Sequence, residues 1–195
     1  MPLLSFLLFV FVSSFTPGPN NIMAMAFANK HGLKKTSKFC LGVGSGFFVI
    51  VLLCTFFNLV LTNIMPIIEF PLTILGVAYM LYLAFKILTS KGNDDDSNDG
   101  SNKNLFIIGA LLQFVNPKGI LFGITVVATF ILPYYSSYFS YFIFSLFLGT
   151  VGVMSTFSWS LFGSIFQKFL LQYEQQFNII MALLLVYSAI SIFFK

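Results

Sequence analysis

Long uncharged, apolar stretches alternate along the chain with short segments that carry almost all of its charge. A helix needs about 20 predominantly apolar residues to cross a bilayer, and these stretches reach that length. They are continuous rather than split into alternating segments of about ten residues, which favours helices over a β-barrel. The pattern predicts an all-α integral membrane protein with six transmembrane helices, at residues 3–28, 39–62, 68–88, 104–132, 138–166 and 176–194.

The composition supports this interpretation. Of the 195 residues, 58% are hydrophobic and 8% are charged, whereas soluble domains have about 25% charged residues. The basic residues are all lysines. Eight of the ten lie in or beside the loops after the first, third and fifth predicted spans, and the loops at 63–67 and 133–137 have none. Because lysine-rich loops stay in the cytoplasm, both termini are predicted to lie outside. The net charge of +4 therefore reflects topology, and we expect the lipid bilayer, and no nucleic acid, as a partner.

A polar segment of low complexity at 89–104, rich in Asp, Asn and Ser, interrupts the apolar pattern. It predicts a cytoplasmic linker between two three-helix units, residues 1–88 and 105–195. Because each unit has an odd number of spans, the two would insert with opposite orientations, as an inverted 3+3 repeat. Short similarities between the halves agree with this, such as Tyr82-Leu83-Ala84 with Tyr187-Ser188-Ala189.

Each half has a proline break inside its first predicted span, so helices one and four are predicted to be broken. The first break reads Thr16-Pro17-Gly18-Pro19-Asn20-Asn21. Proline clashes with the preceding helical turn but suits the first turn of a new helix, so one half-helix should end here and another begin. The freed amides of the second would attract a carboxylate. A plain proline kink is the alternative, but the cluster and its partner motif favour a binding site.

The second break lies in the fourth span, around Asn116 and Pro117. Lys118 is the only charged residue well inside a predicted span, where a charge is costly and usually faces a cavity or a partner. The alternative is a lysine that snorkels to the interface. We expect Lys118 and the first-span half-helix to hold a substrate carboxylate, while nearby amide side chains bind an amino group. The predicted substrate-binding residues are Pro17, Gly18, Pro19, Asn20, Asn21, Gln113, Asn116, Pro117 and Lys118.

The sequence has no catalytic constellation, metal-ligand spacing, phosphate-binding loop or ATP motif, so we expect neither an enzyme nor a cofactor. Cys40 and Cys54 lie on one predicted helix, about 21 Å apart at 1.5 Å per residue, too far for a disulfide. A membrane thiol–disulfide carrier, a different class of function, would need them to meet across a dimer. A passive channel is a third alternative. The oligomeric state is open, with a homo-oligomer as one alternative.

The motifs resemble those of the LysE/RhtB amino-acid exporters. The resemblance rests on the Pro-Gly-Pro of 17–19, the Asn-Pro-Lys of 116–118 and the third-span positions Gly76, Tyr79 and Tyr82, and it runs nearly end to end. The segments 16–32, 111–133 and 177–193 are most similar to the cysteine/O-acetylserine efflux group. This resemblance implies a bacterial inner-membrane secondary transporter that exports cysteine, O-acetylserine or similar small neutral amino acids by proton antiport. Export of threonine, homoserine or leucine-type amino acids is the alternative within the family.

Two features depart from the pattern that the resemblance implies. The chain has no arginine, and no acidic residue lies well inside a predicted span, since Glu69 is at the outer edge of the third. A proton-coupled carrier normally has a titratable group on its pathway, so Lys118, Glu69 or the substrate itself would have to carry the proton. The lack of buried carboxylates also argues against lysine or arginine as the substrate, since a cationic side chain in a dry site needs a partner.

Overall fold

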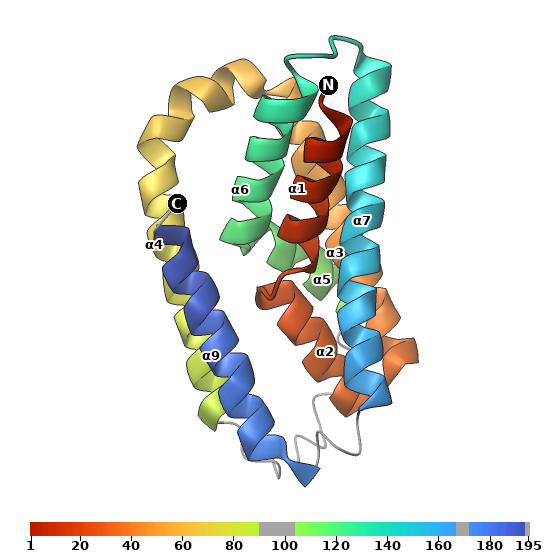
Figure 1. Cartoon of the computed structure of the whole chain (residues 1–195), viewed down its shortest axis with the longest axis vertical. Coiled ribbons are helices and arrows are strands. Elements are labelled where there is room, and N and C mark those ends of the chain that lie inside the picture. The colour runs from red at the N-terminus through yellow and green to blue at the C-terminus, as the bar shows by residue number, and fades with distance from the viewer. Residues whose placement is uncertain (90–103, 167–171, 194–195) are drawn as a thin grey trace.

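The computed structural model describes residues 1–89, 104–166 and 172–193, and the regular structure within these ranges is entirely helical. Most of the predicted linker 89–104 lies outside the described residues. Figure 1 shows the helices arranged along one long axis. They are α1 (Leu3–Phe15), α2 (Pro19–His31), α3 (Leu33–Phe56), α4 (Asn58–Thr89), α5 (Leu105–Val115), α6 (Pro117–Val126), η1 (Val127–Ile131), α7 (Tyr138–Ile165) and α9 (Glu174–Phe193).

The chain bends sharply at Pro17-Gly18-Pro19. Helix α1 ends at Phe15, Gly18 is extended (φ −169°, ψ 170°), and Pro19 is the first residue of α2. The axes of α1 and α2 differ by 49°. The cause is local, because proline removes an amide donor and disturbs the preceding turn, yet is preorganised for a helix start.

A second bend follows Val115. Asn116 leaves the helical region (φ −83°, ψ 104°), and Pro117 opens α6. The axis of α5 makes an angle of 67° with that of the segment Pro117–Ile131. That segment is α6 continued by η1, a single π-helical stretch, and π turns of this kind often occur near functional sites.

Helix α3 lies at the centre of the bundle, against α5 and α7. Glycines let the backbones approach closely, as is common between membrane helices. A Cβ added at Gly46 would lie 2.8 Å from Ala110 O of α5, and one at Gly44 would lie 2.7 Å from Gly149 O of α7. The small residues of α3 therefore allow α5 and α7, from the second half of the chain, to pack closely against α3.

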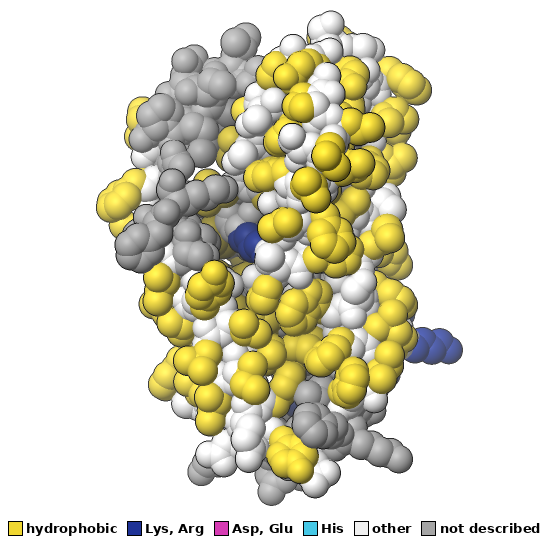
Figure 2. Space-filling model, in the orientation of Figure 1, with side chains coloured by type: hydrophobic (Ala, Val, Ile, Leu, Met, Phe, Trp, Pro, Cys, Tyr) yellow, Lys and Arg dark blue, Asp and Glu magenta, His cyan; other side chains and the backbone are white. Residues whose placement is uncertain are grey.

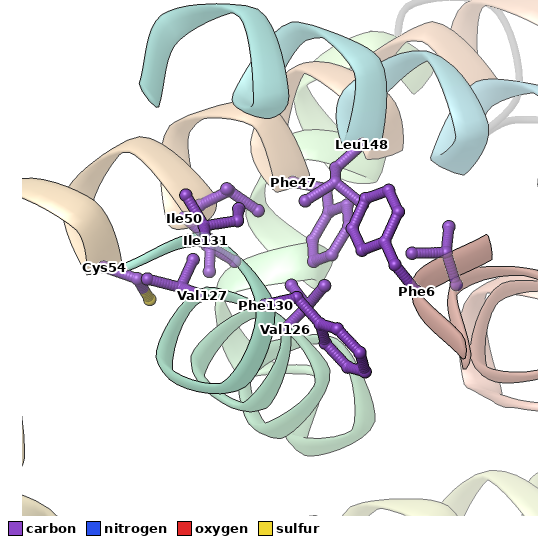
Figure 3. Close-up of a cluster of buried hydrophobic side chains, with 11 residues drawn as sticks. Phe6, Phe47, Ile50, Cys54, Val126, Val127, Phe130, Ile131 and Leu148 are labelled. Atoms are coloured by element: carbon purple, nitrogen blue, oxygen red, sulfur yellow. The ribbon is translucent and has the colours of Figure 1, made fainter. Parts of the chain in front are cut away.

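The half-helix α1 is held by a buried apolar cluster that also includes α3, α6, η1 and α7. Figure 3 shows Phe6 among the side chains of Phe47, Val126 and Leu148. The ring of Phe6 lies edge-on to that of Phe130, with 5.8 Å between centroids. Since a helix as short as α1 has marginal stability alone, this packing is what fixes its position beside the break.

Helices α4 and α9 pair with each other. The sequence placed a loop at 63–67, and this prediction is wrong, because the chain turns at Phe57 and α4 is continuous from Asn58 to Thr89. The helix runs through Pro66 and Pro71, and Figure 1 shows it strongly curved. Proline can bend a helix without ending it, so the two prolines did not mark a boundary.

The surface is suited to a bilayer. Leu33–Phe56 and Tyr138–Ile165 are long and apolar enough to span one, and so is each bent pair, α1 with α2 and α5 with α6–η1; shorter apolar helices cover Thr73–Thr89 and Gln175–Ile190. Figure 2 shows hydrophobic side chains over most of the described surface in view. In Figure 1 the lysine-rich α2–α3 corner lies at the same end of the bundle as the ends of α4 and α7.

Candidate functional site

A pocket adjoins both helix breaks. Part of this pocket is open to the surroundings. The predicted residues on its wall are Gly18, Asn20, Asn21, Gln113, Asn116 and Lys118. Pro17, Pro19 and Pro117 are not on the wall but form the breaks. The structure thus brings together two motifs that are far apart in the sequence.

The two half-helices that follow the breaks begin at this pocket. The Ile22 amide donates to Gly18 O (3.0 Å) in the first turn of α2, and the Ile120 amide donates to Asn116 O (3.0 Å) in that of α6. Amides that precede these in a first turn have no acceptor within the helix. Together with the helix dipoles they make this part of the pocket favourable for a carboxylate.

The carbonyl oxygens at the end of α1 are bonded by side chains. Neutral donors come from three helices, α2, α7 and α9. Their bonds are Asn21 Nδ2 to Ser14 O (2.8 Å) and Thr16 O (3.0 Å), Ser155 Oγ to Ser14 O (2.6 Å), Trp159 Nε1 to Phe15 O (3.1 Å) and Ser188 Oγ to Pro17 O (3.1 Å). The last turn of a helix leaves such carbonyls without intrahelical partners, so these side chains define the shape of the break.

Lys118 is the charged donor to the same break. Its Nζ donates to Thr16 O (2.9 Å), Thr16 Oγ1 (2.8 Å) and Pro17 O (3.1 Å). An ammonium group has three donors, and all three are engaged here. Lys118 therefore contributes its charge to the pocket wall, while a direct bond to a ligand would require it to release one of these oxygens.

Two amide oxygens at the pocket have no partner. Asn20 Nδ2 donates to Gln113 Oε1, but the Oδ1 atoms of Asn20 and Asn116 are buried without a hydrogen bond among the described residues. Asn20 and Asn116 are each only 5% exposed. Since a buried acceptor without a donor costs about 1–3 kcal/mol, these atoms are suited to a ligand that carries N–H or O–H groups.

An apolar wall completes the pocket. It includes Val43 and Phe47 of α3, Phe122 of α6 and Gly152 of α7. The rings of Phe47 and Phe122 stack, with 5.1 Å between centroids and 22° between planes. The site can therefore receive a small molecule that has a charged or polar end and an apolar or weakly polar side chain.

Sequence reasoning missed the contribution of α7. Ser155 and Thr156 line the pocket, and Trp159 binds the end of α1. Ser13, Ser14 and Gly119 also lie on the wall. The only available signal was the spacing of small and polar residues along an apolar helix, which close packing produces equally well.

The cysteines lie elsewhere. Both are buried and free; the thiol of Cys40 contacts Ser160 Oγ at 3.3 Å, and Cys54 belongs to the apolar cluster around Phe6. Neither lies on the pocket wall, so the geometry gives no support to a thiol–disulfide carrier. Within the described ranges, no three His, Cys, Asp or Glu residues come together as metal ligands.

Comparisons with known proteins identify the family. Residues 11–195 match the family model described as LysE type translocator. The chain is 39% identical over 194 residues to the cysteine/O-acetylserine efflux protein of Salmonella typhimurium strain LT2, covering 100% of this chain and 98% of the relative. It is 36% identical over 190 residues to the protein of the same name from Escherichia coli strain K12, covering 97% and 96%. No solved structure matches. The chain belongs to the LysE type translocator family.

Proposed function

We propose that this protein is a secondary transporter that exports small neutral amino acids, with cysteine and O-acetylserine as the first candidates. The observation that carries the proposal is the pocket shared by the two breaks, where helix N-termini, a lysine and unpartnered amide oxygens meet. The names of the full-length relatives supply the candidate substrates. Threonine, homoserine and leucine are the alternatives within this class.

The pocket suggests one orientation for a zwitterion. The substrate carboxylate lies at the N-termini of α2 and α6, with the charge of Lys118 nearby. The ammonium donates to Asn20 Oδ1 and Asn116 Oδ1, which otherwise lack donors. The side chain faces the wall that includes Phe47 and Phe122. Pro17, Pro19 and Pro117 act by holding the breaks open, and Asn21 and Gln113 by holding neighbouring groups.

For the whole chain we propose six spans in an inverted 3+3 repeat, with α1–α2 and α5–α6 as the broken helices. The packing supports this, because α3 lies against the broken helix of the second half and α7 against that of the first, while α4 pairs with α9. The lysine-rich end would face the cytoplasm, with both termini outside a bacterial inner membrane. Proton antiport, with a proton carrier still to be identified, is the proposed source of energy.

Counterflow in proteoliposomes tests the function. Vesicles preloaded with unlabelled amino acid would be diluted into a trace of labelled cysteine, O-acetylserine, threonine, leucine or lysine. We expect transient accumulation of labelled cysteine and O-acetylserine, and none of lysine. Accumulation requires a carrier, so simple equilibration would indicate a channel. Absence of counterflow with every neutral amino acid would refute the proposal.

A further inference from the structure

Lys118 occupies a compact set of oxygen atoms where α1 ends. Thr16 O, Thr16 Oγ1 and Pro17 O surround its Nζ at 2.9, 2.8 and 3.1 Å. All three acceptors are electrically neutral, and they lie at the negative end of the α1 dipole. The set satisfies every donor of the ammonium group without a carboxylate.

Oxygen atoms in this position are suited to monovalent cations. In transporters with broken helices, unwound carbonyls and half-helix C-termini coordinate the coupling ion. Here a side chain brings the positive charge. We propose that Thr16 and Pro17 form a monovalent-cation site that the ammonium of Lys118 fills permanently, in place of a free ion. The inference rests on the proposed function in taking the adjoining pocket as the transport site.

The residues around Thr16 and Pro17 leave space for the side chain of Lys118. A Cβ at Gly18 would lie 2.9 Å from Lys118 Cδ and 3.2 Å from its Nζ, so glycine leaves the room that the lysine needs. Lys118 is in the first turn of α6, and its acceptors are at the end of α1. One side chain therefore joins the two breaks beside the pocket, which a diffusible ion could not do.

The wild-type protein should then need no alkali-metal ion. We expect its thermal unfolding midpoint in detergent and its counterflow rate to stay unchanged when sodium and potassium chloride are replaced by choline chloride of equal concentration. A saturable dependence of either quantity on sodium or potassium would overturn the inference. Because the unfolding assay uses no amino acid, it decides on the cation site even if counterflow fails and the proposed function is refuted.

Removing the side chain of Lys118 should open the Thr16–Pro17 cation site to a small free cation. Lys118→Ala deletes the atoms from Cγ to Nζ, which propylammonium matches in length and charge. Ligands that bind the native state raise the unfolding midpoint. Propylammonium chloride should therefore raise the midpoint of Lys118→Ala in a saturable way and increase the counterflow rate of this variant by at least about tenfold. 1-Propanol, the neutral counterpart, should do neither.

Two further variants sharpen this test. Thr16→Val removes one acceptor, so the double variant Lys118→Ala/Thr16→Val should respond more weakly to propylammonium. Lys35→Ala removes an exposed lysine of α3 and should not respond. An equal response in wild type, Lys35→Ala and Lys118→Ala, or no response in Lys118→Ala, would overturn the inference. If Lys118→Ala does not fold, the alkali-ion dependence of wild type decides the question.

Discussion

At the scale of single residues, Asn116 connects the break to the pocket. It precedes α6, but its side chain makes no capping bond, and its Oδ1 is buried without a partner among the described residues. The side chain is therefore available to a ligand and is not needed to start the helix. Replacing it should affect binding more than folding.

We predict that Asn116→Leu weakens amino-acid binding by about 10- to 100-fold, the effect of losing one hydrogen bond to a charged group of about 1.5–3 kcal/mol. The measurement is the half-saturation constant for cysteine counterflow, with the unfolding midpoint recorded in parallel. Ser158→Ala, which removes an exposed hydroxyl bonded to Met154 O of its own helix, is the control and should match wild type. An unchanged constant would remove Asn116 from the site.

Gly152 sets the space beside the apolar wall. A Cβ there would lie 3.7 Å from Phe47 Cδ1 and 3.7 Å from Gly44 Cα, which is ordinary contact. We predict that Gly152→Ala folds normally and narrows the pocket, so that counterflow of O-acetylserine falls more than that of cysteine. The ratio of the two rates within one preparation is the measurement. An equal decrease for both substrates would argue against a side-chain site at this wall.

The residues predicted from the sequence were those with an unusual local chemistry. A lysine and a Pro-Gly-Pro in apolar sequence are conspicuous, and the structure places Lys118 and Gly18 at one pocket. Ser155 and Trp159 are ordinary residues of an apolar helix, and their role depends on where α1 ends in space. Their bonds to Ser14 O and Phe15 O could not be predicted without the fold. The binding role of the predicted residues stays a prediction.

At the scale of elements, the end of α1 is held by the adjacent α2 and also by α7 and α9, whose bonding residues are more than a hundred positions away. Ser155 of α7 donates to Ser14 O at 2.6 Å, whereas Ser158 of the same helix donates only within α7. We predict that Ser155→Ala lowers the free energy of unfolding by about 0.5–1.5 kcal/mol, because the partly buried Ser14 O loses one of its two donors and keeps the Asn21 amide. Ser158→Ala should change it by less than about 0.5 kcal/mol. Unfolding in detergent measures both, and equal effects would contradict this role.

Close packing of α3 with α7 gives a second expectation at this scale. A Cβ at Gly44 would lie 2.7 Å from Gly149 O and closer still to the Val153 side chain, so the helices would have to separate. We predict that Gly44→Ala lowers the unfolding midpoint clearly, while Gly152→Ala does not. Size-exclusion chromatography and thermal unfolding would compare them, and a Gly44→Ala protein as stable as wild type would show that the helices can shift.

The positions of the elements were predictable where the sequence marks them locally. Helix ends occur at both proline motifs, because proline and glycine change the backbone at the residue where they occur; that these are broken membrane spans stays a prediction. The boundary between α3 and α4 was misplaced, since the turn at Phe57 carries neither glycine nor charge, and α4 continues through Pro66 and Pro71. Such a boundary is decided by packing of whole helices, which short-range signals do not contain.

At the scale of the whole molecule, the two ends of the bundle differ in charge. The α2–α3 corner carries Lys30, Lys34 and Lys35, and in Figure 1 the N-terminus lies at the opposite end. By the positive-inside rule, we predict that a reporter active only in the periplasm is active when fused after residue 194. The same reporter inserted within 90–103 should be inactive. The reverse result would invert the proposed topology.

The placement of the two cysteines has a practical consequence for the proposed export of cysteine. Cys40 and Cys54 are both buried in α3, away from the wall of the pocket. Cystine, the disulfide form of the proposed cargo, therefore meets no cysteine thiol on the pocket wall with which it could exchange. For the same reason, a single cysteine introduced at Ser13 would report access to the route by maleimide labelling without prior removal of the native pair.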